Sequence, residues 1–270
     1  NNSGGLMKRI ASFLSSLSIQ RMIAPCLCLM LVLICLFSFQ KQLAPTSGIV
    51  SSRKLPIYCV NTESPKVAIS FDAAWGNEQT ETLLSILEKY HVKTTFFMTG
   101  GWVESYPDDV KAIAAAGHDL GNHSENHKQM STLSADECKQ EIQKVHDKVK
   151  ELTGQDMILF RPPYGDYNDT LIDAANSLGY HVIQWDIDSL DWKDYGADNI
   201  VSRVVDNDHL GNGSIILMHN GAKYTPDALE RVITGLQEKG YEIVPISQLI
   251  YKENYEMDHE GRQFIKGNAK

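Results

Sequence analysis

Residues that can bind a metal and move a proton lie in three short segments of this chain. His123 and His127 are four residues apart in His-Ser-Glu-Asn-His, a spacing at which two imidazoles can close on one divalent metal. Asp72 ends an apolar segment, where an isolated carboxylate can act as a base beside that metal. Arg161 precedes a rigid Pro-Pro turn, from which its guanidinium can hold such a carboxylate ionised. A histidine pair alone occurs often by chance, but the three segments together predict a metal-assisted hydrolase.

Two further segments carry titratable groups. Residues 185–192, Trp-Asp-Ile-Asp-Ser-Leu-Asp-Trp, combine three acids with two tryptophans, which indicates a partly buried pocket wall rather than a solvated loop. His219 ends an apolar segment, where a histidine is often a hydrogen-bonded core residue. If an aspartate lies beside it, its pKa would rise and it could donate a proton near neutral pH. His118 follows the turn residue Gly117 and is expected to be a structural, hydrogen-bonding histidine.

The elements that must position these residues alternate between strand and helix. Strands are predicted at 66–71, 93–98, 118–122, 158–160, 180–185, 214–218 and 241–244, and helices at 77–90, 107–116, 134–153, 169–178, 198–206 and 225–239. The longest helix has a capping-box pattern, Ser134 with Glu137, and Gly154 at its end. Each candidate residue follows or ends a strand. In an α/β barrel of about seven parallel strands such ends converge on one face.

The composition is that of a globular protein with a hydrophobic core. The chain has 270 residues, of which 43% are hydrophobic and 22% charged. Its net charge of -9, with no basic stripe beyond the N-terminus, argues against a nucleic-acid partner. Outside the N-terminal apolar segment the cysteines are Cys59 and Cys138. We expect two buried free thiols, with a single disulfide bridge as the alternative.

The N-terminal segment differs from the rest of the chain. Residues 22–39 carry no charge over roughly eighteen positions, near the lower limit for crossing a bilayer. Lys8, Arg9 and Arg21 precede them, which predicts a membrane anchor of a bacterial-type membrane with the following domain extracytoplasmic. A cleaved signal peptide is the alternative, but residues 40–45 form a poor cleavage site. The expected organisation is a cytoplasmic segment 1–21, a transmembrane anchor 22–39, a linker 40–64, a catalytic domain 65–252 and a charged, partly ordered tail 253–270.

Residues 66–249 resemble the polysaccharide deacetylases of carbohydrate esterase family 4, which share the NodB homology domain. Five motifs occur in the family's order: Ser70-Phe71-Asp72, His123-Ser124-x-x-His127, Arg161-Pro162-Pro163-Tyr164-Gly165, Asp188-Ser189-Leu190-Asp191-Trp192 and Leu217-Met218-His219. Residues 71–76, Phe-Asp-Ala-Ala-Trp-Gly, are most similar to the sporulation-associated (PdaB-like) branch. The resemblance implies a distorted β/α barrel of NodB type. It also implies a divalent metal, with zinc expected first and cobalt, nickel or manganese as alternatives.

The resemblance further implies a role for each of nine residues. They are the base Asp72 with its tether Arg161, the metal ligands His123 and His127, the acid His219 with the tuning Asp191, and the substrate contacts Tyr164, Trp192 and Leu217. One position departs from the family pattern of two adjacent acids, of which the second binds the metal. Ala73 occupies that second position, and its methyl group cannot bind a metal. The metal site therefore keeps two protein ligands of the usual three.

The predicted function is hydrolysis of an amide bond. We expect a metal-dependent de-N-acetylase that removes acetyl groups from N-acetylated sugars of peptidoglycan or a chitin-like polysaccharide, with a backbone N–H near Tyr164 helping to stabilise the oxyanion. Two alternatives stay open. The chain could be a glycan-binding protein that has lost catalysis through Ala73, or an O-acetyl esterase that uses the same groups.

Overall fold

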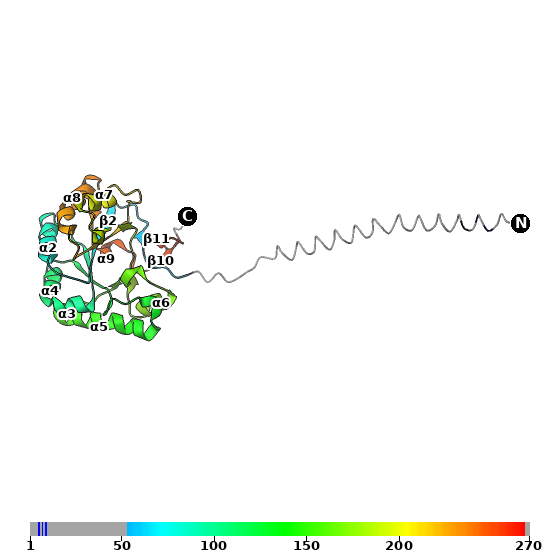
Figure 1. The fold of residues 1–270 in the computed structure, drawn as a ribbon, viewed down its shortest axis with the longest axis horizontal. Helices are drawn as coiled ribbons and strands as arrows, with labels where there is room; N and C mark the ends of the chain where they lie inside the picture. The colour runs from blue at the N-terminus through cyan, green and yellow to red at the C-terminus, as the bar shows by residue number, and fades with distance from the viewer. Residues whose placement is uncertain (1–4, 6, 8, 10–52, 268–270) are drawn as a thin grey trace. The chain divides into compact units, whose positions relative to one another are not determined.

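The computed structural model of the chain describes residues 5, 7, 9 and 53–267. The chain divides at residues 52 and 53, and the unit that begins at residue 53 contains every candidate site residue (Figure 1). The predicted anchor, 22–39, lies outside the described residues. Among the helices that are described, none has the length and apolar character needed to cross a membrane.

A parallel β-sheet forms the centre of the domain. Its path runs, in spatial order, through β6 (His181–Val182), β5 (Leu159–Phe160), β4 (Asp119–Asn122), β3 (Thr95–Met98), β2 (Lys66–Ala73), β8 (Ile215–His219) and β7 (Ile187–Asp188), and β9 (Glu242–Ile243) pairs with β2. Each of these pairings is parallel. The path ends at β6 and β7, so the predicted barrel is an open one. Ile57 bridges to Ile183 beyond β6, and Cys59 bridges to Ser214 before β8.

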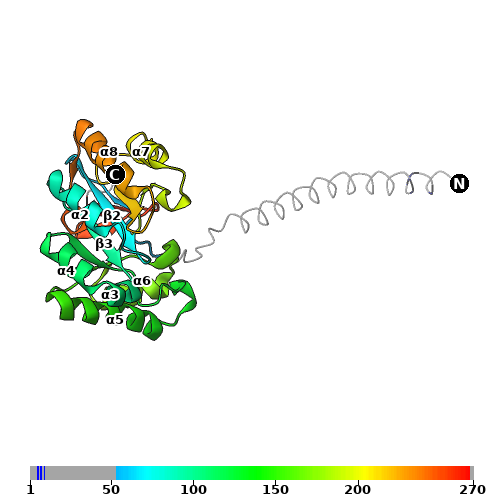
Figure 2. The same cartoon turned by 60° about the vertical axis from the view of Figure 1, so that its left-hand side comes forward.

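Helices lie outside the strands, as the alternating pattern predicts (Figure 2). In the described residues they are α2 (Thr80–Lys89), α3 (Gly100–Ser105), α4 (Pro107–Ala115), α5 (Ala135–Thr153), α6 (Asp169–Ser177), α7 (Ala197–Val205), α8 (Thr225–Glu238) and α9 (Ile246–Leu249). Short 3₁₀ turns are η1 (Met130–Thr132), η2 (Pro163–Gly165) and η3 (Asp191–Lys193). The capping box of Ser134 and Glu137 starts α5, and Gly154 ends it with a φ of 73°.

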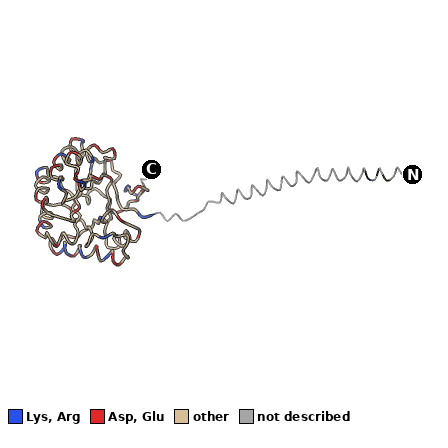
Figure 3. Tube along the Cα trace, viewed as in Figure 1, with Lys and Arg blue, Asp and Glu red and all other residues tan. Residues whose placement is uncertain are grey.

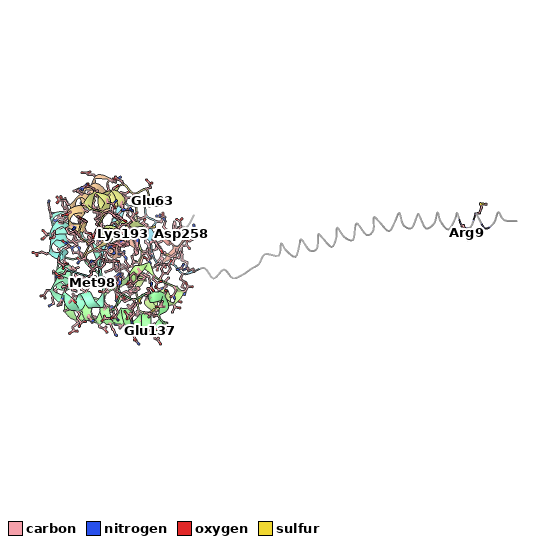
Figure 4. All side chains as sticks on the ribbon, in the orientation of Figure 1. Arg9, Glu63, Met98, Glu137, Lys193 and Asp258 are labelled. Atoms are coloured by element: carbon pink, nitrogen blue, oxygen red, sulfur yellow. The ribbon has the colours of Figure 1, made fainter. Side chains whose placement is uncertain are left out.

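The strand β2 lies at the centre of the sheet and is buried on both faces. All residues from Val67 to Ala73 are buried. The rings of Phe71 and Phe96, on adjacent strands, stack with centroids 5.0 Å apart. Side chains of the sheet and the surrounding helices pack against each other throughout the domain (Figure 4). Asp72 is the one charged residue among these buried positions, so its burial must be compensated by a partner.

Charged residues of both signs are interspersed over the domain (Figure 3). This distribution agrees with the absence of a basic stripe in the sequence of the described domain. Cys59 and Cys138 are both free and buried, as expected. His118 is buried, and its Nδ1 accepts a hydrogen bond from the Thr94 N–H at 3.0 Å. Burial lowers the pKa of His118 to about 4, so it is a neutral structural histidine.

The C-terminal segment is more ordered than expected. Within the predicted tail, β10 (Tyr255–Met257) and β11 (Arg262–Ile265) form a three-stranded sheet with β1 (Cys59–Val60), which lies in the predicted linker. Gln263 is fully buried there, and its amide exchanges two hydrogen bonds with the backbone of Tyr251. The strands were not predicted because charged residues interrupt their alternation. The domain therefore extends beyond the predicted range 65–252 at both ends.

Candidate active site

The carboxyl ends of the strands bring the candidate residues to one pocket. Asp72 and His219 are register partners on β2 and β8, and His123 and Arg161 directly follow the paired residues of β4 and β5. The cavity is about 450 Å³. It is lined by Asp72, Trp75, His123, His127, Pro162, Tyr164, Gly165, Trp185, Asp188, Trp192, Leu217 and His219. Seven of the nine predicted site residues line it, and the other two, Arg161 and Asp191, are buried and bonded to wall residues.

Asp72 is held by an arginine that is itself completely buried. Arg161 Nη1 donates to Asp72 Oδ1 at 2.8 Å, and its Nη2 donates to the Gln184 carbonyl at 3.2 Å. The guanidinium lies 4.1 Å above the Phe97 ring. Burial is the largest influence and opposes ionisation of Asp72, but the charge and hydrogen bond of Arg161, together with the nearby His123 and His219, hold the pKa of the carboxyl below its usual value. The carboxylate is therefore ionised at neutral pH and can accept a proton.

His123 presents a neutral ring nitrogen toward the pocket. Its Nδ1 lies 2.7 Å from the Arg161 carbonyl oxygen, which can only accept, so Nδ1 carries the proton. Its Nε2 is left with a lone pair, 3.5 Å from Asp72 Oδ2. Burial lowers the pKa of His123 to about 4, so the ring is uncharged at neutral pH. A backbone carbonyl that fixes the tautomer in this way is typical of a metal-binding histidine.

His127 lies against His123 in a strained loop. The two ring centroids are 4.9 Å apart, and the His127 ring also packs edge-on against Tyr164 at 4.5 Å. Ser124 and His127 both have positive φ, 66° and 51°, which costs non-glycine residues on the order of 1 kcal/mol or more each. Local bonds offset that cost: Asn122 Oδ1 accepts the Ser124 N–H, and Ser124 Oγ accepts the His127 N–H.

Glu141 fixes the same loop from α5 and was not predicted. Its carboxylate accepts the Asn126 N–H at 2.8 Å and the Asn126 side-chain amide at 2.7 Å. Lys128 Nζ lies 3.1 Å from it. Burial acts to raise the pKa of Glu141, but these bonds hold it below the usual value. A signal was present in the sequence, because Glu141 occupies the apolar face of α5 three residues after Cys138.

The two histidines are suitable ligands for a divalent ion, but two protein ligands are fewer than such a site normally has. Neutral imidazoles are suitable ligands for zinc, but a catalytic zinc site normally has three protein ligands. Ala73 is fully buried at the end of β2, and Asp72 is committed to Arg161. In the part of the chain that the structure describes, no group of three or more His, Cys, Asp or Glu side chains is arranged to hold a metal. The residues present do not form a complete metal site.

His219 is hydrogen-bonded to the buried Asp191 through both its ring and its backbone. Its Nδ1 lies 2.8 Å from Asp191 Oδ1, and its backbone N–H donates to Asp191 Oδ2 at 2.7 Å. The Thr225 hydroxyl also donates to Oδ2, at 2.6 Å. Burial acts to lower the pKa of His219, but Asp191 outweighs it, so the pKa is raised. With Nδ1 engaged, Nε2 is the nitrogen that can give a proton in the pocket.

The predicted substrate contacts all line the pocket, with different exposure. Leu217 is 3% exposed, Trp192 46% and Tyr164 69%. Of the acids in 185–192, Asp188 lines the pocket, whereas Asp186 does not: it accepts hydrogen bonds from the Ile215 N–H and the Ser214 hydroxyl. The run of acids thus combines structural and site residues.

Comparison with known proteins identifies the family. The polysaccharide deacetylase model matches residues 60–183. The protein PdaA of Bacillus subtilis (strain 168), a peptidoglycan-N-acetylmuramic acid deacetylase, is 31% identical over 201 residues, 73% of this chain and 75% of that protein. YlxY of the same strain, which is uncharacterized, is 35% identical over 209 residues, 77% of this chain and 65% of that protein. The chain belongs to the polysaccharide deacetylase family, as the five motifs predict.

Solved structures agree on the fold. A carbohydrate esterase family 4 pseudoenzyme from Bacillus anthracis matches with a TM-score of 0.70 and 35% identity, covering 73% of this chain and 69% of that one. A mutant of it, described as having restored enzymatic activity, matches with a TM-score of 0.70 and 36% identity, covering 73% of this chain and 72% of that one. The same fold therefore carries both active and inactive sites. Family membership therefore places the chain among the amide-hydrolysing deacetylases. Whether its site is complete has to be judged from the residues of the site itself.

Proposed function

We propose that the chain removes acetyl groups from N-acetylated sugars of peptidoglycan or a related glycan. The observation that carries this proposal is the placement of Asp72 and His219 at paired positions of adjacent parallel strands. Neighbouring strands are about 4.8 Å apart, so a base and an acid meet over one small volume of the pocket. Each has its own buried partner, Arg161 or Asp191. The peptidoglycan deacetylases among the relatives support the substrate class.

In this proposal the two sides of the pocket move different protons. Asp72, kept ionised by Arg161, takes a proton from the water that attacks the acetamide carbonyl. His219 gives the proton on Nε2 to the departing amine, and Asp191 stabilises the imidazolium beforehand. The acetyl methyl lies against Leu217 and Trp192, and a backbone N–H near Tyr164 donates to the carbonyl oxygen as negative charge develops there.

Metal dependence is part of the proposal. His123 and His127 are the ligands that we assign to a divalent ion, zinc first, with cobalt, nickel or manganese as alternatives. Since only two ligands are arranged for it, we expect weak binding, and metal occupancy rather than proton transfer should limit turnover.

A second candidate is a glycan-binding protein that has lost hydrolysis. It is favoured by the buried methyl of Ala73 at the end of β2 and by the similarity to the Bacillus anthracis pseudoenzyme. Such a protein would bind the same glycan through the same pocket walls. An O-acetyl esterase is distinguished from both by its substrate.

The test measures acetate released by the full chain from N-acetylchitotetraose and from purified peptidoglycan. Each reaction is run after chelation and across a zinc titration, with Asp72→Asn as the control. Zinc-dependent release that Asp72→Asn abolishes supports the deacetylase. Binding of the oligosaccharide without acetate release at any zinc concentration supports the glycan-binding candidate, and release from O-acetylated substrate alone supports the esterase.

We also propose that residues 22–39 anchor the chain and that the catalytic domain is extracytoplasmic. The support is the uncharged run of these residues after Lys8, Arg9 and Arg21. Protease added to intact cells should digest the domain while the membrane fraction retains the N-terminal segment. Recovery of the whole chain in the soluble cell fraction would contradict the anchor.

A further inference from the structure

Trp75 lies on the pocket wall and has no place in the mechanism above. It follows β2, three residues after Asp72, and none of the five sequence motifs includes it. It is 46% exposed, which is high for the largest apolar side chain. Its ring centroid is 5.3 Å from that of His219, with the planes inclined by 32°. The indole therefore packs beside the imidazole at a moderate tilt, and nearly half of this pocket-lining side chain stays exposed.

The surroundings of Trp75 are built to receive it. A Cβ atom on Gly221 would lie 2.4 Å from the Trp75 carbonyl oxygen and 2.6 Å from its Nε1, so the loop after β8 approaches this closely only because residue 221 is glycine. The Asn220 N–H donates to the Asp72 carbonyl at 2.9 Å. On the other side, Trp102 Nε1 donates to the Gly76 carbonyl at 2.7 Å. Contacts on both sides thus hold the segment that carries Trp75.

We propose that Trp75 is a specificity-determining residue, whose open face stacks on a sugar ring next to the N-acetyl sugar that reacts. A pyranose has apolar C–H faces, and a flat indole can cover such a face by van der Waals contact without a hydrogen bond. Trp192 and Tyr164 are also partly exposed on the same pocket, so its mouth is aromatic on more than one side. The position of Trp75 beside His219 sets the stacked ring close to the departing amine. This inference rests on the proposed function, because it requires that the pocket bind a glycan.

The stacking contact predicts a dependence on chain length. N-acetylglucosamine alone fills only the reacting position, whereas N-acetylchitopentaose also reaches Trp75. The loss of one aromatic contact weakens binding by about threefold to tenfold. Trp75→Leu should therefore weaken the pentamer by that factor and leave the monomer nearly unchanged. Trp75→Phe keeps a flat ring and should retain most of the affinity for the pentamer.

Isothermal titration of the full chain with both sugars tests the inference, with circular dichroism of each variant as the folding check. Tyr195→Ala is the matched control, because Tyr195 is 60% exposed and is not among the described residues that line the pocket. A selective loss of pentamer affinity in Trp75→Leu, but not in Trp75→Phe or Tyr195→Ala, supports the stacking role.

Two results overturn it and are distinguishable. If the wild type binds the pentamer and Trp75→Leu binds it equally well, the stacking role is wrong and the proposed function stands. If the wild type binds neither sugar and releases no acetate, both fail together. Equal losses for monomer and pentamer in both Trp75 variants would also overturn the stacking role, because they would indicate a general disturbance of the pocket.

Discussion

The two sides of the pocket differ in how completely their chemistry is assembled. On the β7–β8 side, Asp191 accepts three hydrogen bonds, two from His219 and one from Thr225. His219, the proposed acid, is therefore held by its partner aspartate. On the β2–β4 side, His123 and His127 are neutral and close together, but Ala73 offers no third donor. In the proposed function, proton transfer uses two pairs of side chains, Asp72 with Arg161 and His219 with Asp191, and both pairs are complete. Metal binding uses His123 and His127 and lacks a third ligand at position 73, next to Asp72. A single position can therefore weaken one function of the pocket and leave the other intact.

The largest effect is expected where the two sides meet, at Asp72. Asp72→Asn should lower the rate of acetate release by about two to four decades, because the amide cannot accept the proton of the attacking water. The domain should still fold, but with lower stability, since the buried charge of Arg161 loses its counter-charge. Turnover and thermal unfolding of the same preparation are the measurements. Near-wild-type turnover in the folded variant would refute the base assignment.

Separate substitutions on the two sides should separate turnover from metal content. His219→Ala should lower kcat by about two decades or more with metal content unchanged, because it removes only the acid. His123→Ala or His127→Ala should remove the metal itself. Metal analysis of the three purified variants, alongside their kcat values, checks the division. Equal loss of metal in all three would show that the sides are not independent.

Ala73→Asp should complete the weaker side. A carboxylate oxygen adds a ligand and a negative charge to two neutral imidazoles. Since changing even the second layer of a metal site alters affinity on the order of tenfold to a hundredfold, we expect at least that decrease in the zinc Kd. Activity at limiting zinc should rise with it. A zinc titration of both proteins at one pH decides the matter, and unchanged or weaker affinity would mean that position 73 is not the vacant ligand position.

Smaller effects are expected from residues that support each side, and each variant should change a different property. Glu141→Gln loosens the loop of His127 and should weaken zinc binding by about tenfold, with kcat at saturating zinc unchanged.

Thr225→Val keeps the shape of the side chain but removes the hydroxyl that donates to Asp191. It should shift the His219 limb of the pH–rate profile without changing zinc affinity. The Glu141 and Thr225 variants control for each other. If either variant changed both the zinc affinity and the pH–rate profile, the two sides of the pocket would not be independent.

The sequence predicted the strand ends well because parallel β/α units place them at one edge by geometry alone. Asp72, His123 and His219 each follow a clear apolar run, and the pocket contains all three. The capping box of α5 was also readable, since it is a local hydrogen-bond pattern. Glu141 left a sequence signal, an acid on the apolar face of α5, but its bonds to Asn126 and the packing of Trp75 against His219 are contacts between elements that the sequence does not reveal. The strands of the C-terminal segment were missed because charged residues mask their alternation, and a buried amide, Gln263, supplies part of their stability.

The pairing of β1 with β11 also affects how the chain reaches its native state. Cys59 and Arg262, which are register partners, are about 200 residues apart in the sequence. Closing so long a loop is entropically costly, and chains with many such distant pairings fold slowly. The strand β1 can contact Ser214 earlier, but its pairing with β11 must wait until β11 has been synthesised. Until then its edge is open, and chaperone binding or self-association would act on this intermediate rather than on the finished domain.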